Sequence, residues 1–335
     1  MARELSPQNV FMDRFLLEPK VQRVWDIPHA TWFTLMGLGG GMFMTVRVLD
    51  LEGRLGTWLG LPVADLISFL AIAVGGLILI ADLGKPMRFI RAVVNPKTSW
   101  ISRGAIADFV FLVVGGLLVL PNLSVGSARP FSWLPWDASA GNVAGATLEL
   151  ITIAAAVIVT FYAGQVLATP RAIPYWNSPA IPLQFLLSSL ALSMATVLVM
   201  EVANDRPVTA GQLGVLIVVL VGLAATIVWH LASNRDTPGK SHSLEELRRG
   251  RYRVGFLGGV LVAGTVAPAV LALVAIPATP ARDALSVVIL AIVVPAAFFL
   301  RLITLRVGIF PPVMQIPGPG SPVRGGSAIT GAAGT

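Results

Sequence analysis

Eight long apolar stretches fill most of this chain of 335 residues. A helix needs about 20 mostly apolar residues to cross the hydrocarbon core of a bilayer, and every stretch reaches that length. Only 12% of the residues are charged, too few to coat a soluble protein of this size. The pattern therefore predicts an all-α integral membrane protein with eight transmembrane helices. The expected spans are residues 28–50, 62–82, 102–121, 142–168, 180–200, 208–232, 254–277 and 283–307.

The connecting segments divide these spans into two groups of four. In each group the long basic loop follows the second span, at residues 83–103 and 233–253. The approach to the first span reads Trp25-Asp-Ile-Pro28, and the approach to the fifth reads Trp176-Asn-Ser-Pro179. We therefore expect two four-helix bundles that are related as a parallel repeat.

This division predicts four regions. The first bundle covers residues 28–168 and the second covers residues 169–310. An arm of residues 1–27 precedes them, and its polar composition leaves no room for the apolar core of a signal peptide. The tail, residues 311–335, is rich in Gly, Pro and Ser and is expected to be disordered.

Two local signals predict details of the packing. Gly37 and Gly41 form a small-xxx-small pair in the first span, which lets a neighbouring backbone approach closely. Ser243 is followed by Glu245 and Glu246, the pattern of a helix cap with acidic residues in the first turn. We therefore expect a short surface helix that begins at Ser243.

The positive charges predict how the protein crosses the membrane. Nineteen of the 24 Lys and Arg residues, with Arg301 and Arg306 of the last span among them, fall on the face that carries both termini. Cytoplasmic loops carry an excess of Lys and Arg, so we expect both termini in the cytoplasm and a multi-pass protein of the inner (plasma) membrane. Because the charges lie in membrane loops, they indicate contact with membrane lipids and no nucleic-acid partner.

The residue types that hold redox metals are scarce. The chain has no Cys, which excludes thiolate zinc sites and iron–sulfur ligation within it. The histidines are His29, His230 and His242, whereas a two-haem membrane cytochrome needs four axial histidines. We therefore expect no haem, no iron–sulfur cluster and no other metal in this chain.

Three acidic residues lie inside the expected spans, apart from those at the end residues, and an ionisable group is costly there. Asp65 lies near the outer end of the second span, Asp108 one to two turns from the cytoplasmic end of the third, and Glu149 well inside the fourth. Together they suggest a proton relay; alternatively, each one caps a helix or bonds a neighbouring hydroxyl. Glu201, at the outer end of the fifth span, is expected to be solvated.

A second group of polar residues is expected at the cytoplasmic end of the first bundle. His29 opens the first span, Asp82 closes the second, and Tyr162 lies about a turn and a half from the end of the fourth. A quinone has two carbonyls that accept hydrogen bonds, and its reduction takes up two protons, which a His can supply. Trp32 can line the ring or tail. The alternative is an ordinary interfacial belt of aromatic residues and satisfied polar caps.

Several motifs together resemble the polysulfide-reductase membrane-subunit family of the NrfD/PsrC type. The resemblance runs from about residue 22 to residue 310, and the combination of motifs is specific although each one alone is weak. The motifs are Trp25-Asp-Ile-Pro-His29-Ala-Thr-Trp-Phe-Thr-Leu-Met-Gly37-Leu-Gly-Gly-Gly41, Asp82-Leu-Gly-Lys-Pro86-Met-Arg-Phe89, Asn95-Pro-Lys-Thr98-Ser-Trp100-Ile-Ser-Arg-Gly104, Tyr162-Ala-Gly164, Pro174-Tyr-Trp176-Asn177-Ser-Pro and Phe299-Leu-Arg301-Leu-Ile-Thr-Leu-Arg306.

The resemblance implies a membrane subunit that exchanges electrons with ubiquinone or menaquinone and carries no metal of its own. It implies a docked ferredoxin-like iron–sulfur subunit and, beyond it, a molybdenum or tungsten catalytic subunit. The family's quinone-contacting tyrosine matches Tyr162. Its polar contacts on the first helix fall on residues 29–32, where an Asn and a His of one characterised pattern are replaced by His29 and Trp32.

The predicted function is that of a quinone-interacting membrane anchor in a respiratory oxidoreductase, without a catalytic centre of its own. The alternatives are a secondary transporter, since buried acids and repeated bundles also suit alternating access, a proton-translocating membrane subunit, and a passive anchor without a quinone site. An acidic partner subunit would be attracted to the two basic loops by complementary charge. The residues expected to dock it are Lys85, Arg88, Arg248, Arg249 and Arg251.

Overall fold

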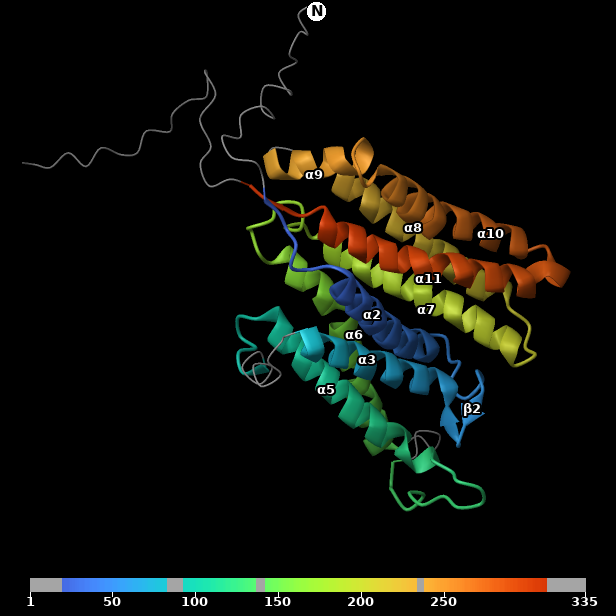
Figure 1. The fold of residues 1–335 in the computed structure, drawn as a ribbon. Coiled ribbons are helices and arrows are strands. Elements are labelled where there is room, and N and C mark those ends of the chain that lie inside the picture. Colours follow the sequence, from blue (N-terminus) through green and yellow to red (C-terminus); the bar gives the residue numbers. More distant parts are fainter. Residues whose placement is uncertain (1–19, 83–92, 137–141, 234–237, 312–335) are drawn as a thin grey trace, which may run out of the picture.

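The structure is a computed structural model that describes residues 20–82, 93–136, 142–233 and 238–311. Long helices running back and forth make up most of this described part, and they lie side by side (Figure 1). The long helices are α2 (Ile27–Val48), α3 (Val63–Asp82), α5 (Trp100–Val119), α6 (Val143–Ala168), α7 (Ala180–Ala203), α8 (Ala210–Ala232), the π-helix η3 (Val254–Val266) continued by α10 (Ala267–Ala275), and α11 (Arg282–Arg306).

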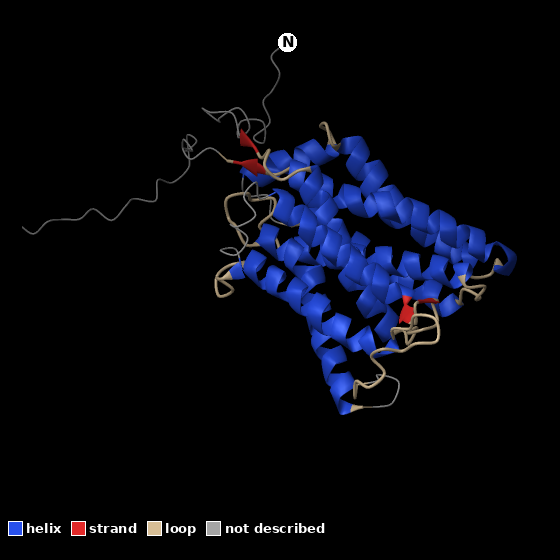
Figure 2. Cartoon of the chain, turned by 60° about the horizontal axis from the view of Figure 1, so that its bottom comes forward, coloured by secondary structure: helices blue, strands red, loops and turns tan. Residues whose placement is uncertain are grey.

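The short elements cap the two ends of this helix array. Helix α9 (Pro238–Arg248) and the 3₁₀ turns η1 (Leu120–Asn122) and η4 (Thr279–Ala281) lie in the connections. Strand β1 (Lys20–Val21) pairs antiparallel with β4 (Ile309–Phe310), and β2 (Thr57–Trp58) pairs antiparallel with β3 (Leu61–Pro62). Figure 2 shows the two strand pairs at opposite ends of the helices.

We call the end that carries the β1–β4 pair the near face and the end that carries the β2–β3 pair the far face. Helices α2, α5, α7 and η3 begin at the near face, whereas α3, α6, α8 and α11 end there. The β1–β4 pair holds both ends of the described chain at the near face. A bond from Arg306 Nε to Asp26 Oδ1, 2.6 Å long, reinforces this junction and lowers the pKa of the Asp26 carboxyl.

Within the described residues, seven helices are long and apolar enough to cross a membrane. They correspond to the second to eighth expected spans, so seven of the eight predictions are confirmed in position and type. The first expected span is the 22-residue helix α2, which is long enough but less apolar because it contains four glycines and several polar residues. Eight apolar spans are therefore not confirmed.

Helix α2 lies in the middle of the molecule. It packs against α3, α6, α7 and α11, and most of its residues are buried by these neighbours. A Cβ on Gly39 would lie 2.7 Å from the Ser68 carbonyl of α3, and one on Gly40 would lie 2.8 Å from the Ala156 carbonyl of α6. The glycines therefore let neighbouring backbones approach α2 on different sides.

The glycine pair predicted from the sequence faces helix α7. A Cβ on Gly41 would lie 3.1 Å from the Ser189 carbonyl, and Gly37 lies against the Ser189 side chain. The predicted close approach at Gly37 and Gly41 is confirmed. Because α2 packs against α7 and α11 of the second half as well as α3 and α6 of the first, the division into two four-helix bundles is not confirmed.

Candidate functional site

The first turn of α2 and the last residue of α3 meet at the near face. His29 Nε2 lies 3.4 Å from Asp82 Oδ2. The Asp82 side chain is 40% exposed whereas that of His29 is 10% exposed, so Asp82 lies between the imidazole and the near-face solvent. The indole of Trp25 stacks on the imidazole with ring centroids 4.8 Å apart and an interplanar angle of 22°.

Trp32 and Tyr162 continue this cluster into the membrane. Both side chains are buried, and their ring centroids are 6.0 Å apart. Tyr162 reaches across from α6 to α5, where its hydroxyl donates to Asp108 Oδ2 at 3.3 Å. Its ring lies against the backbone of Gly104, where a Cβ would collide with the ring atoms. The glycine of α5 thus determines how closely the phenol and the carboxyl group can approach.

Three polar atoms in this cluster are buried and have no hydrogen-bond partner among the described residues. They are His29 Nδ1, Trp32 Nε1 and Asp108 Oδ1; the Trp32 indole lies close to the Tyr162 hydroxyl, but not in the geometry of a hydrogen bond. Buried polar atoms are nearly always paired in folded proteins, because leaving one unpaired costs its full desolvation. The cluster therefore presents a fixed donor at the indole, an acceptor at the carboxyl group and an imidazole nitrogen that can do either.

The structure brings together all four residues that the sequence singled out for this site, His29, Trp32, Asp82 and Tyr162. It adds Asp108, which the sequence analysis had placed in a proton relay. A signal for this pairing exists in the sequence: Asp108 lies eight residues after the start of α5, and Tyr162 six residues before the end of α6. At 1.5 Å per residue both lie about 10 Å from the near face.

The other two acids of the predicted relay meet at the far face, around Arg47. The Arg47 guanidinium binds both carboxylate oxygens of Asp65, with Nη2 to Oδ2 at 2.9 Å. Arg47 Nε lies 3.3 Å from Glu52 Oε1 and 3.6 Å from Glu149 Oε1. Asp65 and Glu149 are thus members of one charge cluster, whereas Asp108 lies near the opposite face.

Glu52 is the member of this cluster that sequence reasoning missed. It lies in the loop after α2, and its side chain is 39% exposed, so nothing in the sequence pattern distinguishes it from an ordinary solvated acid. Partial desolvation raises the pKa of Glu52 to about 7; the Arg47 charge opposes this shift, and the negative charges of Glu149 and Asp65 add to it. One arginine thus faces three carboxyl groups.

The predicted docking residues on the second basic loop differ in their surroundings. Arg249 is well exposed, and its nearest charged partner is Glu245 at 3.9 Å. The Arg251 guanidinium lies 5.9 Å from the Tyr252 ring. Arg248 Nη2 donates to the Leu231 carbonyl at 3.2 Å, so it ties α9 to α8. Lys85 and Arg88 lie outside the described residues.

Two predictions about charged residues are wrong. Arg301, which we had counted among the near-face charges, is 1% exposed in the interior, because α11 turns it toward α7. Glu201, expected to be solvated, is also 1% exposed and accepts a hydrogen bond of 2.8 Å from Gln212 Nε2. The capping box at the start of α8 places Gln212 beside Glu201.

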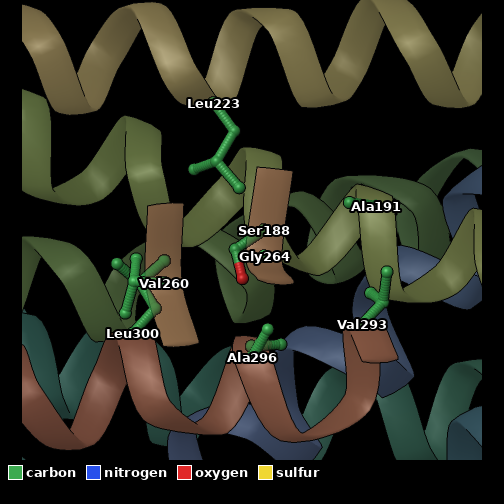
Figure 3. Close-up of a pocket in the computed structure, with 9 residues that line it drawn as sticks. Ser188, Ala191, Leu223, Val260, Gly264, Val293, Ala296 and Leu300 are labelled. Carbon is green, nitrogen blue, oxygen red and sulfur yellow. The ribbon is translucent and has the colours of Figure 1, made fainter. Parts of the chain in front are cut away.

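A small pocket lies between α7, α8, η3 and α11, away from the near-face cluster (Figure 3). Apart from the hydroxyl of Ser188, its walls are apolar, and the four predicted quinone residues are not part of them. The lining residues include Leu223 of α8, Val260 and Gly264 of η3, and Val293, Ala296 and Leu300 of α11. No group of three or more metal-binding side chains exists among the described residues.

Comparison with known protein families identifies the family of this chain. The model of the polysulphide reductase NrfD family matches residues 17–312, nearly the whole chain. The chain belongs to the NrfD family. This NrfD-family protein is therefore a multi-pass membrane protein, and the family expected from its motifs is confirmed.

Two relatives show how far the similarity extends. The C chain of the polysulfide reductase of Wolinella succinogenes is 29% identical over 178 residues, which cover 51% of the present sequence and 56% of that protein. Protein NrfD of Escherichia coli is 26% identical over 234 residues, which cover 60% of the present sequence and 72% of that protein. The match therefore spans little more than half the length of the Wolinella succinogenes protein.

Proposed function

We propose that this protein is the quinone-binding membrane subunit of a respiratory redox complex, which exchanges electrons between a docked iron–sulfur subunit and the quinone pool. The observation that carries the proposal is the set of three unpaired buried polar atoms, His29 Nδ1, Trp32 Nε1 and Asp108 Oδ1, beside aromatic rings at the near face. A ring with two carbonyl or hydroxyl oxygens, which are acceptors or donors according to redox state, complements this set.

A bound quinone, ubiquinone or menaquinone, would supply the reversible two-electron, two-proton chemistry of the site. The protein's own residues bind it and handle protons. Trp32 Nε1–H would donate a hydrogen bond to a ring oxygen. His29 Nε2 faces Asp82 and its Nδ1 is unpaired, so the imidazole would pass a proton from the half-exposed carboxyl group inward.

Tyr162 and the aromatic rings give the site its shape. Tyr162 donates to Asp108 and so fixes the orientation of that carboxyl group, whose second oxygen stays available. Trp25, Trp32 and Phe33 pack on one another around His29 and exclude water from the imidazole. The protein itself supplies no electron carrier in this scheme.

The partners follow from the near-face location of the site. The Wolinella succinogenes relative is, by its name, one chain of a multi-chain enzyme. We extend this to the present protein: a ferredoxin-like iron–sulfur subunit docks at the near face, with a molybdenum or tungsten catalytic subunit beyond it. By the positive-inside rule, we expect the basic near face on the cytoplasmic side of the inner membrane.

The far-face cluster supports proton translocation as a second candidate function. Both Nη atoms of Arg47 bind the Asp65 carboxylate. Glu52 and Glu149 both approach the third guanidinium nitrogen, Nε. Because the pKa of Glu52 is raised to about 7, this carboxyl group can bind and release a proton near neutral pH. Asp108 near the other face and Glu149 here would be the ends of such a path. The expected consequence is that Glu149→Gln reduces proton movement across sealed vesicles while quinone-linked electron transfer continues.

The proposed quinone site is tested by comparing two buried tyrosines. Tyr162→Phe removes the hydroxyl that orients Asp108, and Tyr175→Phe removes a hydroxyl at an equally buried near-face position beside His230. In the assembled complex, Tyr162→Phe should lower quinone-linked turnover at least tenfold, whereas Tyr175→Phe should leave it within twofold. Equal quinone-linked turnover in both variants would favour a passive anchor without a quinone site. If the parent protein instead took up a substrate across the membrane without electron transfer, a transporter would be favoured.

A further inference from the structure

Arg301 is a guanidinium buried in the membrane-spanning part of the molecule among neutral partners. Its nitrogens donate to the Ser188 and Ser189 hydroxyls at 3.1 and 2.7 Å, and to the carbonyls of Ala297 and Phe185 at 2.8 and 3.3 Å. The guanidinium carbon also lies 5.1 Å from the centre of the Phe185 ring. Arg301 itself is 1% exposed.

The positive charge of Arg301 has no carboxylate partner among the described residues. The ion pairs formed there involve Arg47, Arg249, Arg306 and His29, and Arg301 Nε has no hydrogen-bond partner at all. An unpaired charge in the membrane interior is costly and commonly marks a functional site. The fold therefore keeps one uncompensated positive charge here.

Aromatic side chains separate the Arg301 guanidinium from the proposed quinone site. A Cβ on Gly37 would come within 2.7 Å of Arg301 Nη2, so the guanidinium touches α2 one turn below Phe33. The Phe33 ring is 5.8 Å from the Phe185 ring under the guanidinium and 4.5 Å from the ring of Trp32. Two aromatic rings separate Arg301 from the unpaired indole nitrogen.

The Asp82 carboxyl group, beside His29 at the edge of the site, disfavours a ligand that carries negative charge on its oxygens. A positive charge at this distance, in a medium of low dielectric constant, offsets that repulsion without touching the ligand.

We infer that Arg301 is a specificity-determining residue of the quinone site and makes it favour ligands with negative charge on a ring oxygen. The inference rests on the proposed quinone site. The pocket in Figure 3 is not the place of this preference, because Ser188, its polar residue, already accepts a hydrogen bond from Arg301 and the remaining walls are apolar.

The test compares two probes of similar size on the purified full-length protein in detergent. Lawsone, a hydroxynaphthoquinone, is ionised at neutral pH, and menadione, a methyl-naphthoquinone, is neutral. Quenching of tryptophan fluorescence reports their binding, since Trp25 and Trp32 lie at the site. A unit charge at roughly 10 Å and an effective dielectric constant of about 20 corresponds to about a tenfold change in affinity.

The parent protein should bind lawsone at least as tightly as menadione. Arg301→Gln should raise the Kd of lawsone about tenfold and leave that of menadione within twofold. Arg301→Lys, which keeps the charge, and Ser189→Ala, which removes one neutral partner, should both keep the parent's preference. Tyr162→Phe should weaken both probes, because it changes the shared site.

Four results would overturn the inference. A parent protein that prefers menadione shows that the charge does not act on the site, and this measurement needs no variant. Equal weakening of both probes by Arg301→Gln assigns Arg301 a structural role. Lawsone binding that depends on Arg301 but not on Tyr162 places the anion elsewhere. Failure of the parent to bind either probe contradicts the quinone site itself, and the inference with it.

Discussion

At the scale of single residues, two buried tryptophans at the near face show the difference between a completed and an open polar contact. Trp176 Nε1 donates to the Thr304 carbonyl at 2.7 Å, so its indole ties α11 to the segment before α7. Trp32 Nε1 has no partner among the described residues, although its side chain is even less exposed. The same side chain thus stabilises the fold in one place and presents a free donor in the other.

Replacing each tryptophan by Phe separates these roles. Trp176→Phe leaves the buried Thr304 carbonyl unpaired and should lower the free energy of unfolding by about 1–3 kcal/mol more than Trp32→Phe. Trp32→Phe should weaken quinone binding, which Trp176→Phe should spare. Thermal unfolding in detergent and quinone titration measure the two effects, and a pair of variants with identical profiles would contradict the assignment.

Glu52 predicts a pH dependence of stability. Its pKa rises from 4.5 in the unfolded chain to about 7 in the folded protein, chiefly by partial desolvation. The folded state therefore binds more protons between these values, and the stabilisation present below pH 4.5 is lost as the pH rises through about 7.

The matched variant for this pH dependence is Glu52→Gln. Its unfolding temperature should vary less between pH 4.5 and 7 than that of the parent. A control at an exposed acid, Asp205→Asn, should reproduce the parent's curve. Parallel curves for the parent and Glu52→Gln would show that the carboxyl group titrates as it does in water.

The residues that can bind a ligand or transfer a proton could be recognised from the sequence, but their partners could not. The equal depth of His29 and Asp82 follows from the alternation of spans, and the structure pairs them. Arg47 lies near the end of the first expected span, where the sequence does not single it out, and only the packing of α2 against α3 reveals Asp65 as its partner. Rotation of a helix about its axis, which determines such pairs, is weakly encoded when apolar residues surround the whole helix.

At the scale of elements, α5 shows how a glycine positions a residue of the site on a neighbouring helix. Gly104 lies under the Tyr162 ring, whereas a Cβ added to Gly116 of the same helix would have no neighbouring atom within 4 Å. Gly104→Ala should displace the phenol from Asp108 and cost about 1–3 kcal/mol. Gly116→Ala should be neutral or stabilise by up to about 1 kcal/mol, because Ala favours a helix.

The readouts for this glycine pair are unfolding temperature and quinone affinity. Gly104→Ala should reduce both, and Gly116→Ala should reduce neither. If Gly104→Ala were as stable as Gly116→Ala and bound quinone equally well, the contact between Gly104 and Tyr162 would not position the site.

Helix α9 shows why the ends of elements were harder to predict than their existence. The sequence signalled a surface helix with Ser243 as its cap, and the helix is present. It begins at Pro238 instead, and Ser243 lies inside it, where its hydroxyl donates to the Val307 carbonyl at 2.7 Å. A tertiary contact with the segment after α11 therefore uses the hydroxyl that local capping would have used.

At the scale of the whole molecule, the charged near face predicts where soluble partners bind. Arg249 and Arg251 lie on the second basic loop and have few intramolecular contacts, whereas Arg248 supports α9. Reversing Arg249 and Arg251 to Glu should release the soluble subunits at moderate salt, because complementary charge steers and holds them.

The control for docking reverses two exposed arginines of the far face, Arg54 and Arg129. This change alters the net charge by the same amount but leaves the near face as it is. Copurification at several salt concentrations measures both variants. Equal retention of the soluble subunits in the two variants would count against near-face docking.

Seven of the eight spans could be predicted from apolarity alone, but the grouping of the helices could not. The loop pattern suggested two separate bundles, yet α2 packs against helices of both halves. Its glycines and polar residues lower its apolarity and at the same time allow this central position. A hydropathy scale detects helices that contact lipid. It therefore detects least well a helix such as α2, which is surrounded by protein.

The central position of α2 has a consequence for biosynthesis. Among the described helices, α2 is the first long one to be synthesised, and its neighbour α11 is the last. At about 5–20 residues per second, the two are separated by roughly tens of seconds of translation. During that interval the glycine face of α2 has no α11 to cover it, and β1 has no β4 to pair with. A nascent polypeptide that stops before α11 therefore leaves α2 without one of its neighbours, so synthesis of α11 determines when the packing of α2 is completed.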